Sequence, residues 1–234
     1  MLNKVRLNFF MKKIATIYTD FPEKFGIPRQ SGLLENKAVI IFEKEYSCPQ
    51  AFVGLEGFSH LWLIWEFSLS KTKEFSPSVR PPLLGGNKKM GVFATRSPFR
   101  PNPIGLSVVK LLKVEKTKDK GVVLHVEGAD IVNGTSIFDV KPYLPYADKI
   151  ENAVGGWTEN LTERKLNVEI SPEFLKVIDG DNQAQIIKIL QLDPRPSYVD
   201  DERSFGLSYA GYEISFVVKG KVLTVTKVER SVKN

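Results

Sequence analysis

The residues best suited to chemistry lie in the segment GVFATRSPFRPNPIGLS, Gly91 to Ser107. Between Arg96 and Pro103, eight consecutive positions hold three prolines and two arginines. Each proline fixes its own φ angle and pushes the preceding residue toward extended geometry, so the loop is rigid without ladder hydrogen bonds. Guanidinium groups and the Asn102 amide on such a loop form a polar surface that loses little entropy on binding. The segment predicts a binding loop; a proline-rich corner that only ends a strand is the plainer alternative.

A second polar cluster lies in GADIVNGTSIFDVKPYLPY, Gly128 to Tyr146. Asn133-Gly134 predicts a turn. In the strand that follows the turn, Asp139 and Lys141 would lie on one face. They form either a surface ion pair worth under about 1 kcal/mol or part of a site. Asp130, just before the turn, is the other carboxylate of interest.

The chain is poor in residues that bind metals or form disulfides. Cys48 is its single cysteine, which excludes an intramolecular disulfide, and His60 and His125 are its two histidines. This is too few soft ligands for an ordinary structural zinc site, and neither histidine lies in a pattern typical of a nucleophilic triad. No apolar run has the length that a signal peptide or a membrane helix needs. We expect a soluble, cytoplasmic protein without a metal.

Positive charge is concentrated in one part of the chain. The net charge is +6, but the segment from Lys71 to Lys113 holds nine cations and one anion. That segment carries +8, which leaves −2 for the rest of the chain. Such a concentration favours an acidic partner such as nucleic acid, although a solvated basic face would look the same in sequence.

The elements that must hold these residues are mostly strands. The 234 residues, 42% of them hydrophobic, are enough to bury a large core. Short strands separated by turns, with one early helix at 47–55, favour a small β-barrel or sandwich. We predict the strands at 13–19, 37–42, 58–67, 106–114, 121–127 and 135–142. Since no strand precedes a glycine-rich phosphate-binding motif, a nucleotide-like ligand would not be bound in the Rossmann manner.

A smaller α+β module is predicted after a polar, glycine-containing linker. Ser171 followed by proline is typical of a helix start, and Asp181 is expected to cap a second helix that ends near residue 192. The segment 212–228 reads as a hairpin around a glycine turn. We therefore expect a mainly β chain with a barrel domain at 12–150 and a small α+β domain at 160–234.

Six motifs together resemble the TsaA-like family, also called the TrmO family. The resemblance runs from about residue 12 to 228. The motifs are FGIPRQSGL (25–33), EGFSHLWLIWEF (56–67), RPPLLGGN (80–87), the proline-arginine segment 91–107, NGTSIFDVKPYLPY (133–146) and LDPRPSY (192–198).

The resemblance implies a β-barrel, homodimeric tRNA methyltransferase that uses S-adenosylmethionine. Its implied reaction is methylation of N6 of N6-threonylcarbamoyladenosine at position 37, next to the anticodon of threonine tRNA. The missing glycine-rich motif and the concentrated cations agree with this reading.

The resemblance also places a cofactor site on this sequence. Similar proteins often carry His-Gln where this chain has Ser68-Leu69, so backbone contacts are expected to replace side-chain contacts there. The implied cofactor-binding residues are Gln30, Ser31, Gly32, Ser68, Leu69, Arg96, Leu106, Glu127, Gly128, Ala129 and Asp130.

The acceptor side of the reaction needs two things from the protein. Methyl transfer requires the acceptor nitrogen to be held close and in line, and the N6 proton must leave. We expect Asp139 to serve as base or orienting carboxylate, with Lys141 and Tyr143 near the acceptor. Arg100 and Lys141 could pair with the threonyl carboxylate. The residues expected to bind the RNA are Arg100, Asn102 and Tyr146, with Phe99 and Tyr143 as further stacking surfaces.

Two other functions are compatible with the same residues. A non-catalytic RNA-binding module would use the basic segment for phosphates and the tyrosines for bases. An oligomeric scaffold with a basic face would bind neither RNA nor cofactor. In the second module, Arg195 and Tyr198 are expected to face either RNA or a dimer partner.

Overall fold

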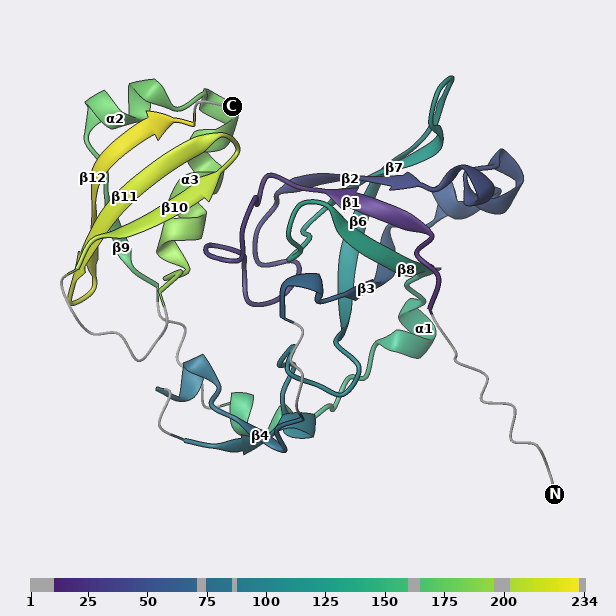
Figure 1. Ribbon diagram of the computed structural model, residues 1–234, viewed down its shortest axis with the longest axis horizontal. Helices are drawn as coiled ribbons and strands as arrows, with labels where there is room; N and C mark the ends of the chain where they lie inside the picture. The colour runs from purple at the N-terminus through teal and green to yellow at the C-terminus, as the bar shows by residue number, and fades with distance from the viewer. Residues whose placement is uncertain (1–10, 71–74, 86–87, 160–164, 196–202, 232–234) are drawn as a thin grey trace.

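Six strands form a closed barrel, which confirms the predicted mainly β fold (Figure 1). The computed structural model describes residues 11–70, 75–85, 88–159, 165–195 and 203–231. The strand order around the barrel is β1-β2-β7-β6-β3-β8, antiparallel throughout. The barrel strands are β1 (Ala15–Tyr18), β2 (Lys37–Phe42), β3 (His60–Glu66), β6 (Ile104–Thr117), β7 (Gly121–Glu127) and β8 (Thr135–Pro142).

Alternating side chains fill the inside of the barrel. Along β3, Leu61, Leu63 and Trp65 are buried, while the residues between them are partly exposed. Because every second side chain of each strand points inward, the barrel interior is a packed apolar core. Closure also leaves the main sheet without an unpaired edge.

The segment predicted as a helix at 47–55 is not one. It forms short 3-10 turns at Pro49–Phe52 and Leu55–Gly57, after another such turn at Lys44–Tyr46. Gly54 has a φ of 85°, which a continuous helix does not allow, so the turns stay separate. Two short strands that the sequence did not predict, β4 (Ser78–Val79) and β5 (Met90–Gly91), form a small ribbon below the barrel in Figure 1.

The C-terminal body is a four-stranded sheet with two helices. Ser171 caps α2 as predicted, because its hydroxyl accepts a hydrogen bond from the Phe174 amide at 3.4 Å. The cap of α3 is Asp179, and the predicted cap Asp181 lies in the first turn. The sheet order is β10-β11-β12-β9, and the elements are β9 (Asn167–Glu169), α2 (Pro172–Val177), α3 (Gly180–Gln191), β10 (Phe205–Tyr209), β11 (Tyr212–Lys219) and β12 (Val222–Arg230). A four-residue helix, α1, spans Pro145–Asp148 after the barrel.

The loop after β1 belongs to the core of the C-terminal body. Phe21 and Leu34 are fully buried there, and the Ala210 amide donates to the Asp20 carbonyl at 3.0 Å. In Figure 1 this loop reaches from the barrel toward the green and yellow C-terminal body. The division into domains at 12–150 and 160–234 stays a prediction, and the packing crosses it.

No helix in the described ranges combines the length and the hydrophobicity that crossing a membrane requires.

Replacing Phe21 by alanine tests how strongly the two bodies are joined. Because the ring is fully buried against Tyr209, with ring centroids 4.9 Å apart, the change should lower the free energy of unfolding by about 3 to 5 kcal/mol. The matched control is Phe93→Ala, since the Phe93 ring is 72% exposed, and it should change stability by less than about 0.5 kcal/mol. Urea unfolding measures both. Equal effects of the two variants would contradict the described packing.

Candidate functional site

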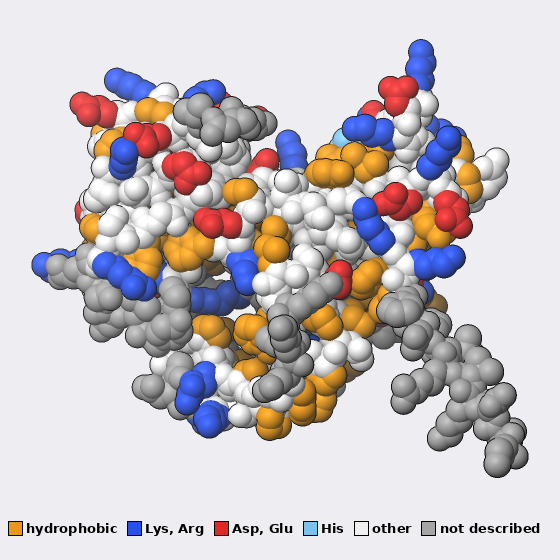
Figure 2. All heavy atoms as spheres, in the orientation of Figure 1, with side chains coloured by type: hydrophobic (Ala, Val, Ile, Leu, Met, Phe, Trp, Pro, Cys, Tyr) orange, Lys and Arg blue, Asp and Glu red, His pale blue; other side chains and the backbone are white. Residues whose placement is uncertain are grey.

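A cleft of about 480 Å³ opens at the end of the barrel where β3 ends and β6 and β8 begin. Its walls come from four separate segments, within residues 24–30, 65–70, 95–106 and 130–135. The volume is that of a site for a small molecule. In Figure 2 the surface is hollowed where the C-terminal body, the barrel and the β4 region meet, with Lys and Arg side chains around it.

A chain of hydrogen bonds holds a carboxylate in this cleft. The Trp65 indole donates to the Ser107 hydroxyl at 2.9 Å, and this hydroxyl donates to Asp130 at 2.6 Å. Trp65 lies flat over Gly105, where an added Cβ would be 2.2 Å from the indole ring. Burial raises the pKa of the Asp130 carboxyl above its usual range, and the Ser107 hydrogen bond and the Arg96 charge offset part of that rise.

Arg96 faces the same cleft from the proline loop. Its guanidinium donates to the Gln30 side-chain oxygen at 2.6 Å. Because Arg96 also acts electrostatically on Asp130, the cleft presents a cation and an anion side by side. Such a pair suits a zwitterionic ligand, in which carboxylate and cationic groups are close together.

Backbone contacts tie the loop that carries Gln30 to the barrel. The Gly32 amide donates to the Gly128 carbonyl at 2.9 Å, and the Val108 amide donates to the Ser31 hydroxyl at 3.2 Å. Gly128 has a φ of 91°, and an added Cβ there would lie 3.4 Å from the Gly32 backbone, so this approach favours glycine at 128.

The cleft therefore brings together predicted cofactor residues from distant parts of the sequence. Ser68 and Leu69 form a turn directly after β3, and the Leu69 carbonyl accepts from the Lys24 ammonium at 2.9 Å. Glu127 and Ala129 do not line the cleft; Glu127 pairs with Lys110 at 3.2 Å, and Ala129 is buried. The predicted cofactor residues that line the cleft are Gln30, Ser68, Leu69, Arg96, Leu106 and Asp130.

Arg100 braces its own loop while it lines the cleft. One guanidinium nitrogen donates to the Val92 carbonyl at 3.1 Å and to the Thr95 carbonyl at 2.8 Å. The group also lies over the Phe93 ring, 5.4 Å from its centroid. Asn102 is exposed in the same loop outside the cleft lining.

The residues expected at the acceptor lie in the second half of β8 and in the segment that follows it, outside the cleft lining of this chain. Asp139 pairs with Lys141 at 2.9 Å; the Lys141 side chain is exposed and that of Asp139 is half-buried. The Tyr143 ring lies against Trp62, with centroids 5.9 Å apart, and Tyr146 is 87% exposed.

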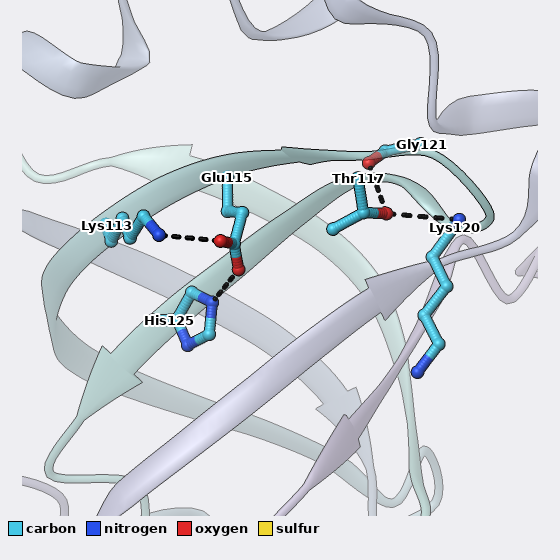
Figure 3. A network of polar contacts seen from close by, with 6 residues as sticks. All are labelled: Lys113, Glu115, Thr117, Lys120, Gly121 and His125. Atoms are coloured by element: carbon cyan, nitrogen blue, oxygen red, sulfur yellow. Dashed lines mark hydrogen bonds and ion pairs between the residues drawn. The ribbon is translucent and has the colours of Figure 1, made fainter.

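The two histidines have partners that do not involve the cleft. His125 on β7 bonds Glu115 on β6 at 2.8 Å, and Glu115 also pairs with Lys113 at 2.6 Å (Figure 3). Hydrogen bonds from Lys113 and His125 lower the pKa of Glu115. His60 lies beside Ser59, 2.9 Å from its hydroxyl. Within the described ranges, no cluster of His, Cys, Asp and Glu could hold a metal ion.

The sequence did not predict two contributors to the site, Ser107 and Trp65, and one residue was misplaced. Ser107 and Trp65 hold Asp130, and Arg29 lines the cleft. A signal for Ser107 exists in the sequence, because alternation along β6 places it among inward-facing residues. Arg195, expected at the surface, is buried against Asp193. Tyr198 lies outside the described residues, as do Lys71 and Lys73 of the basic segment.

Comparison with known proteins matches both parts of the chain to one family. Residues 16–149 match the model of the tRNA-methyltransferase O N-terminal domain, and residues 163–231 match that of the TrmO C-terminal domain.

Relatives and solved structures agree with these models. The tRNA (adenine(37)-N6)-methyltransferase of Escherichia coli is 37% identical over 222 residues, which is 92% of this chain and 94% of that protein. A Pseudomonas aeruginosa relative with the provisional name S-adenosylmethionine-dependent methyltransferase RcsF is 36% identical over 83% of this chain and 86% of its own. The crystal structure of TrmO from Pseudomonas aeruginosa superposes with a TM-score of 0.77 at 28% identity, covering 96% of this chain and 98% of that one. The resemblance seen in the sequence is therefore confirmed, and the chain belongs to the tRNA-methyltransferase O family.

Proposed function

We propose that this protein is an S-adenosylmethionine-dependent methyltransferase that acts on N6 of the adenosine at position 37 of tRNA. The specific substrate that we propose is N6-threonylcarbamoyladenosine at this position of threonine tRNA. One observation carries the proposal: the cleft gathers Gln30, Arg96 and Asp130 from three distant segments into a single small-molecule site. The names of the E. coli and P. aeruginosa relatives support the same chemistry.

The residues of the cleft fit the proposed cofactor by their chemistry. S-adenosylmethionine supplies a methyl group on a positively charged sulfur, and it also carries an ammonium, a carboxylate and an adenine ring. Asp130 is a partly buried carboxylate suited to the cationic groups, and Arg96 is suited to the carboxylate. Leu106 and Ile104 offer apolar surface beside them. Ser68 and Leu69 contribute backbone groups, and the hydrogen bond from Gly32 to Gly128 holds the loop that carries Gln30.

On the acceptor side, the protein must orient the base and accept a proton. Asp139 is the proposed base or orienting carboxylate, and Lys141 pairs with it at 2.9 Å. Tyr143 and Tyr146 are proposed to hold the base. Arg100 and Lys141 would recognise the threonyl carboxylate, because a site built for a charge rejects a substrate that lacks it.

The proposal includes a homodimer located in the cytoplasm. Since Asp139, Lys141 and Tyr143 do not line the cleft of their own chain, we assign them to the cleft of the other copy. Tyr146, Ile150 and Val154 follow them in the sequence and leave large apolar surfaces exposed, which suits such a contact. The two proposed domains, 12–150 and 160–234, would place both proposed sites on the barrel.

A labelling assay tests the reaction itself. With methyl-labelled S-adenosylmethionine, threonine tRNA that carries the threonylcarbamoyl group should be labelled, and the same tRNA without the group should not. Equal labelling of both would overturn the substrate. Salt-sensitive RNA binding with no calorimetric signal for the cofactor would instead favour the RNA-binding module.

Asp130→Asn should separate binding from stability. Losing the carboxylate should raise the Kd for S-adenosylmethionine at least about tenfold, a change of about 1.4 kcal/mol. Burial raises the pKa of Asp130 in the folded state above its value in the unfolded state, so ionisation of this carboxyl opposes folding. Below the unfolded-state pKa the protonated carboxyl contributes its full stability. This contribution is lost as the pH rises through the folded-state pKa. The variant should therefore gain stability relative to the native protein as pH rises through this window. Calorimetry measures the Kd, and urea unfolding at pH 3 to 7 measures the difference in stability between the variant and the native protein. A stability difference that does not change with pH would contradict the expected pH dependence.

Asp139→Asn should lower the rate of methyl transfer at least about tenfold while thermal stability and cofactor affinity stay near native.

Mixing the Asp139→Asn variant with the Arg96→Ala variant tests the proposed dimer. If Asp139 serves the other copy's cleft, randomly mixed dimers should recover about a quarter of native activity, because half are heterodimers and each has one intact site. No recovery, with heterodimers verified, would place Asp139 in its own cleft or outside the mechanism.

A further inference from the structure

The sequence motif Asp193-Pro194-Arg195 forms a buried ion pair next to the end of α3. The Arg195 guanidinium donates to both Asp193 carboxylate oxygens, at 2.9 and 3.0 Å. Both residues are less than a tenth exposed. Asp193 also has a φ of 50°, which is uncommon for a residue with a side chain.

This arrangement is costly for the fold. Removing two charges from water carries a desolvation penalty that their attraction often does no more than cancel, and the left-handed backbone adds strain. Stability alone is therefore a weak reason for it. What the pair does achieve is a fixed backbone shape from Asp193 to Arg195.

The backbone from Asp193 to Arg195 holds the guanidinium of Arg29, which lies in the loop that carries Gln30. One nitrogen of Arg29 donates to the Asp193 carbonyl and to the Arg195 carbonyl, each at 3.3 Å. The position suits a cation, because it lies just beyond the C-terminal end of α3, where the helix dipole is negative. Arg29 is followed directly by Gln30, which bonds Arg96, and by Ser31, which bonds β6.

The rest of the loop lies between the same two surfaces. On the side of the C-terminal body, the Phe25 ring stacks near Phe205 and Phe216, with centroids 6.4 Å from each. A Cβ on Gly26 would come within 2.1 Å of Leu207, so the loop backbone is pressed against β10. On the opposite side, Ile27 and Gln30 line the cleft.

We infer that the Asp193–Arg195 pair is a positioning device for the cofactor site: it fixes the backbone that holds Arg29, and Arg29 in turn sets the loop that carries Gln30 and Ser31. The C-terminal body thus supports this loop from behind, and none of its described residues lines the cleft. The inference rests on the proposed binding of S-adenosylmethionine in this cleft.

A double-mutant cycle tests whether the Asp193–Arg195 pair affects cofactor binding through Arg29. Arg195→Met should raise the KM and Kd for S-adenosylmethionine about tenfold, with a smaller effect on kcat, because the loop loses its anchor while the residues that bind remain. In an Arg29→Ala background, the same change should alter the Kd by less than about twofold, since the link that transmits it is already gone. Arg195→Lys should restore part of the affinity, because it keeps the charge but not the two-nitrogen contact.

Val228→Ala is the matched control for loss of stability. Val228 is buried in the core of the same body on β12, and it lies outside the cleft and the Arg29 contact. It should lower Tm and leave the Kd for the cofactor unchanged, with all binding measured well below Tm.

Three outcomes are decisive. If the native protein binds no S-adenosylmethionine, the proposed function fails, and the inference fails with it. If the native protein binds it and Arg195→Met binds equally well, the positioning role alone is overturned. If Arg195→Met has the same effect with and without Arg29, or if Val228→Ala weakens binding as much, the pair acts only through general stability.

Discussion

The cleft depends on one constraint: the carboxylate of Asp130 is kept largely out of water. Burial of such a group costs free energy unless hydrogen bonds compensate. Here the compensation is built from neighbouring strands, because Ser107 on β6 donates to Asp130 and Trp65 on β3 donates to Ser107. The barrel end is shaped around this chain of contacts. The indole can take its place only because β6 has a glycine at position 105, directly opposite Trp65.

The proline loop must direct the Arg96 side chain into the cleft that Asp130 also lines. Proline fixes backbone angles but has no N–H to donate, so the loop needs another source of order. Arg100 supplies it by binding the Val92 and Thr95 carbonyls from within the loop. The two arginines therefore differ in their contacts: Arg100 holds the loop, and Arg96 extends from it to Gln30. Spacing alone does not distinguish them.

Local patterns predicted the barrel well, since alternation, turns and caps are properties of a few neighbouring residues. The strands and the Ser171 cap were correct for this reason. The helix at 47–55 was wrong because Gly54 adopts a left-handed conformation, and a lone glycine in the sequence is compatible with either outcome. The core to which Phe21 belongs was unpredictable for a different reason. Burial can be read from hydrophobicity, but the choice between two cores depends on contacts with residues almost 200 positions away. The proposed cofactor residues came from the family resemblance, and the sequence did not predict the contacts that hold them, such as the hydrogen bonds of Ser107 between strands.

A β-bulge explains why the cleft and the proposed acceptor residues lie on different surfaces. Thr135 and Ile137 of β8 are buried, and uninterrupted alternation would turn Asp139 into the barrel as well. The register between β3 and β8 shifts, however, so that Ile64 pairs with Asp139 and Trp65 with Ile137. Past this bulge Val140 packs against the core, and Asp139 and Lys141 are directed to the surface. Bulges often re-aim side chains next to active sites. Asp139 is thereby available to a ligand or partner that approaches the barrel from outside.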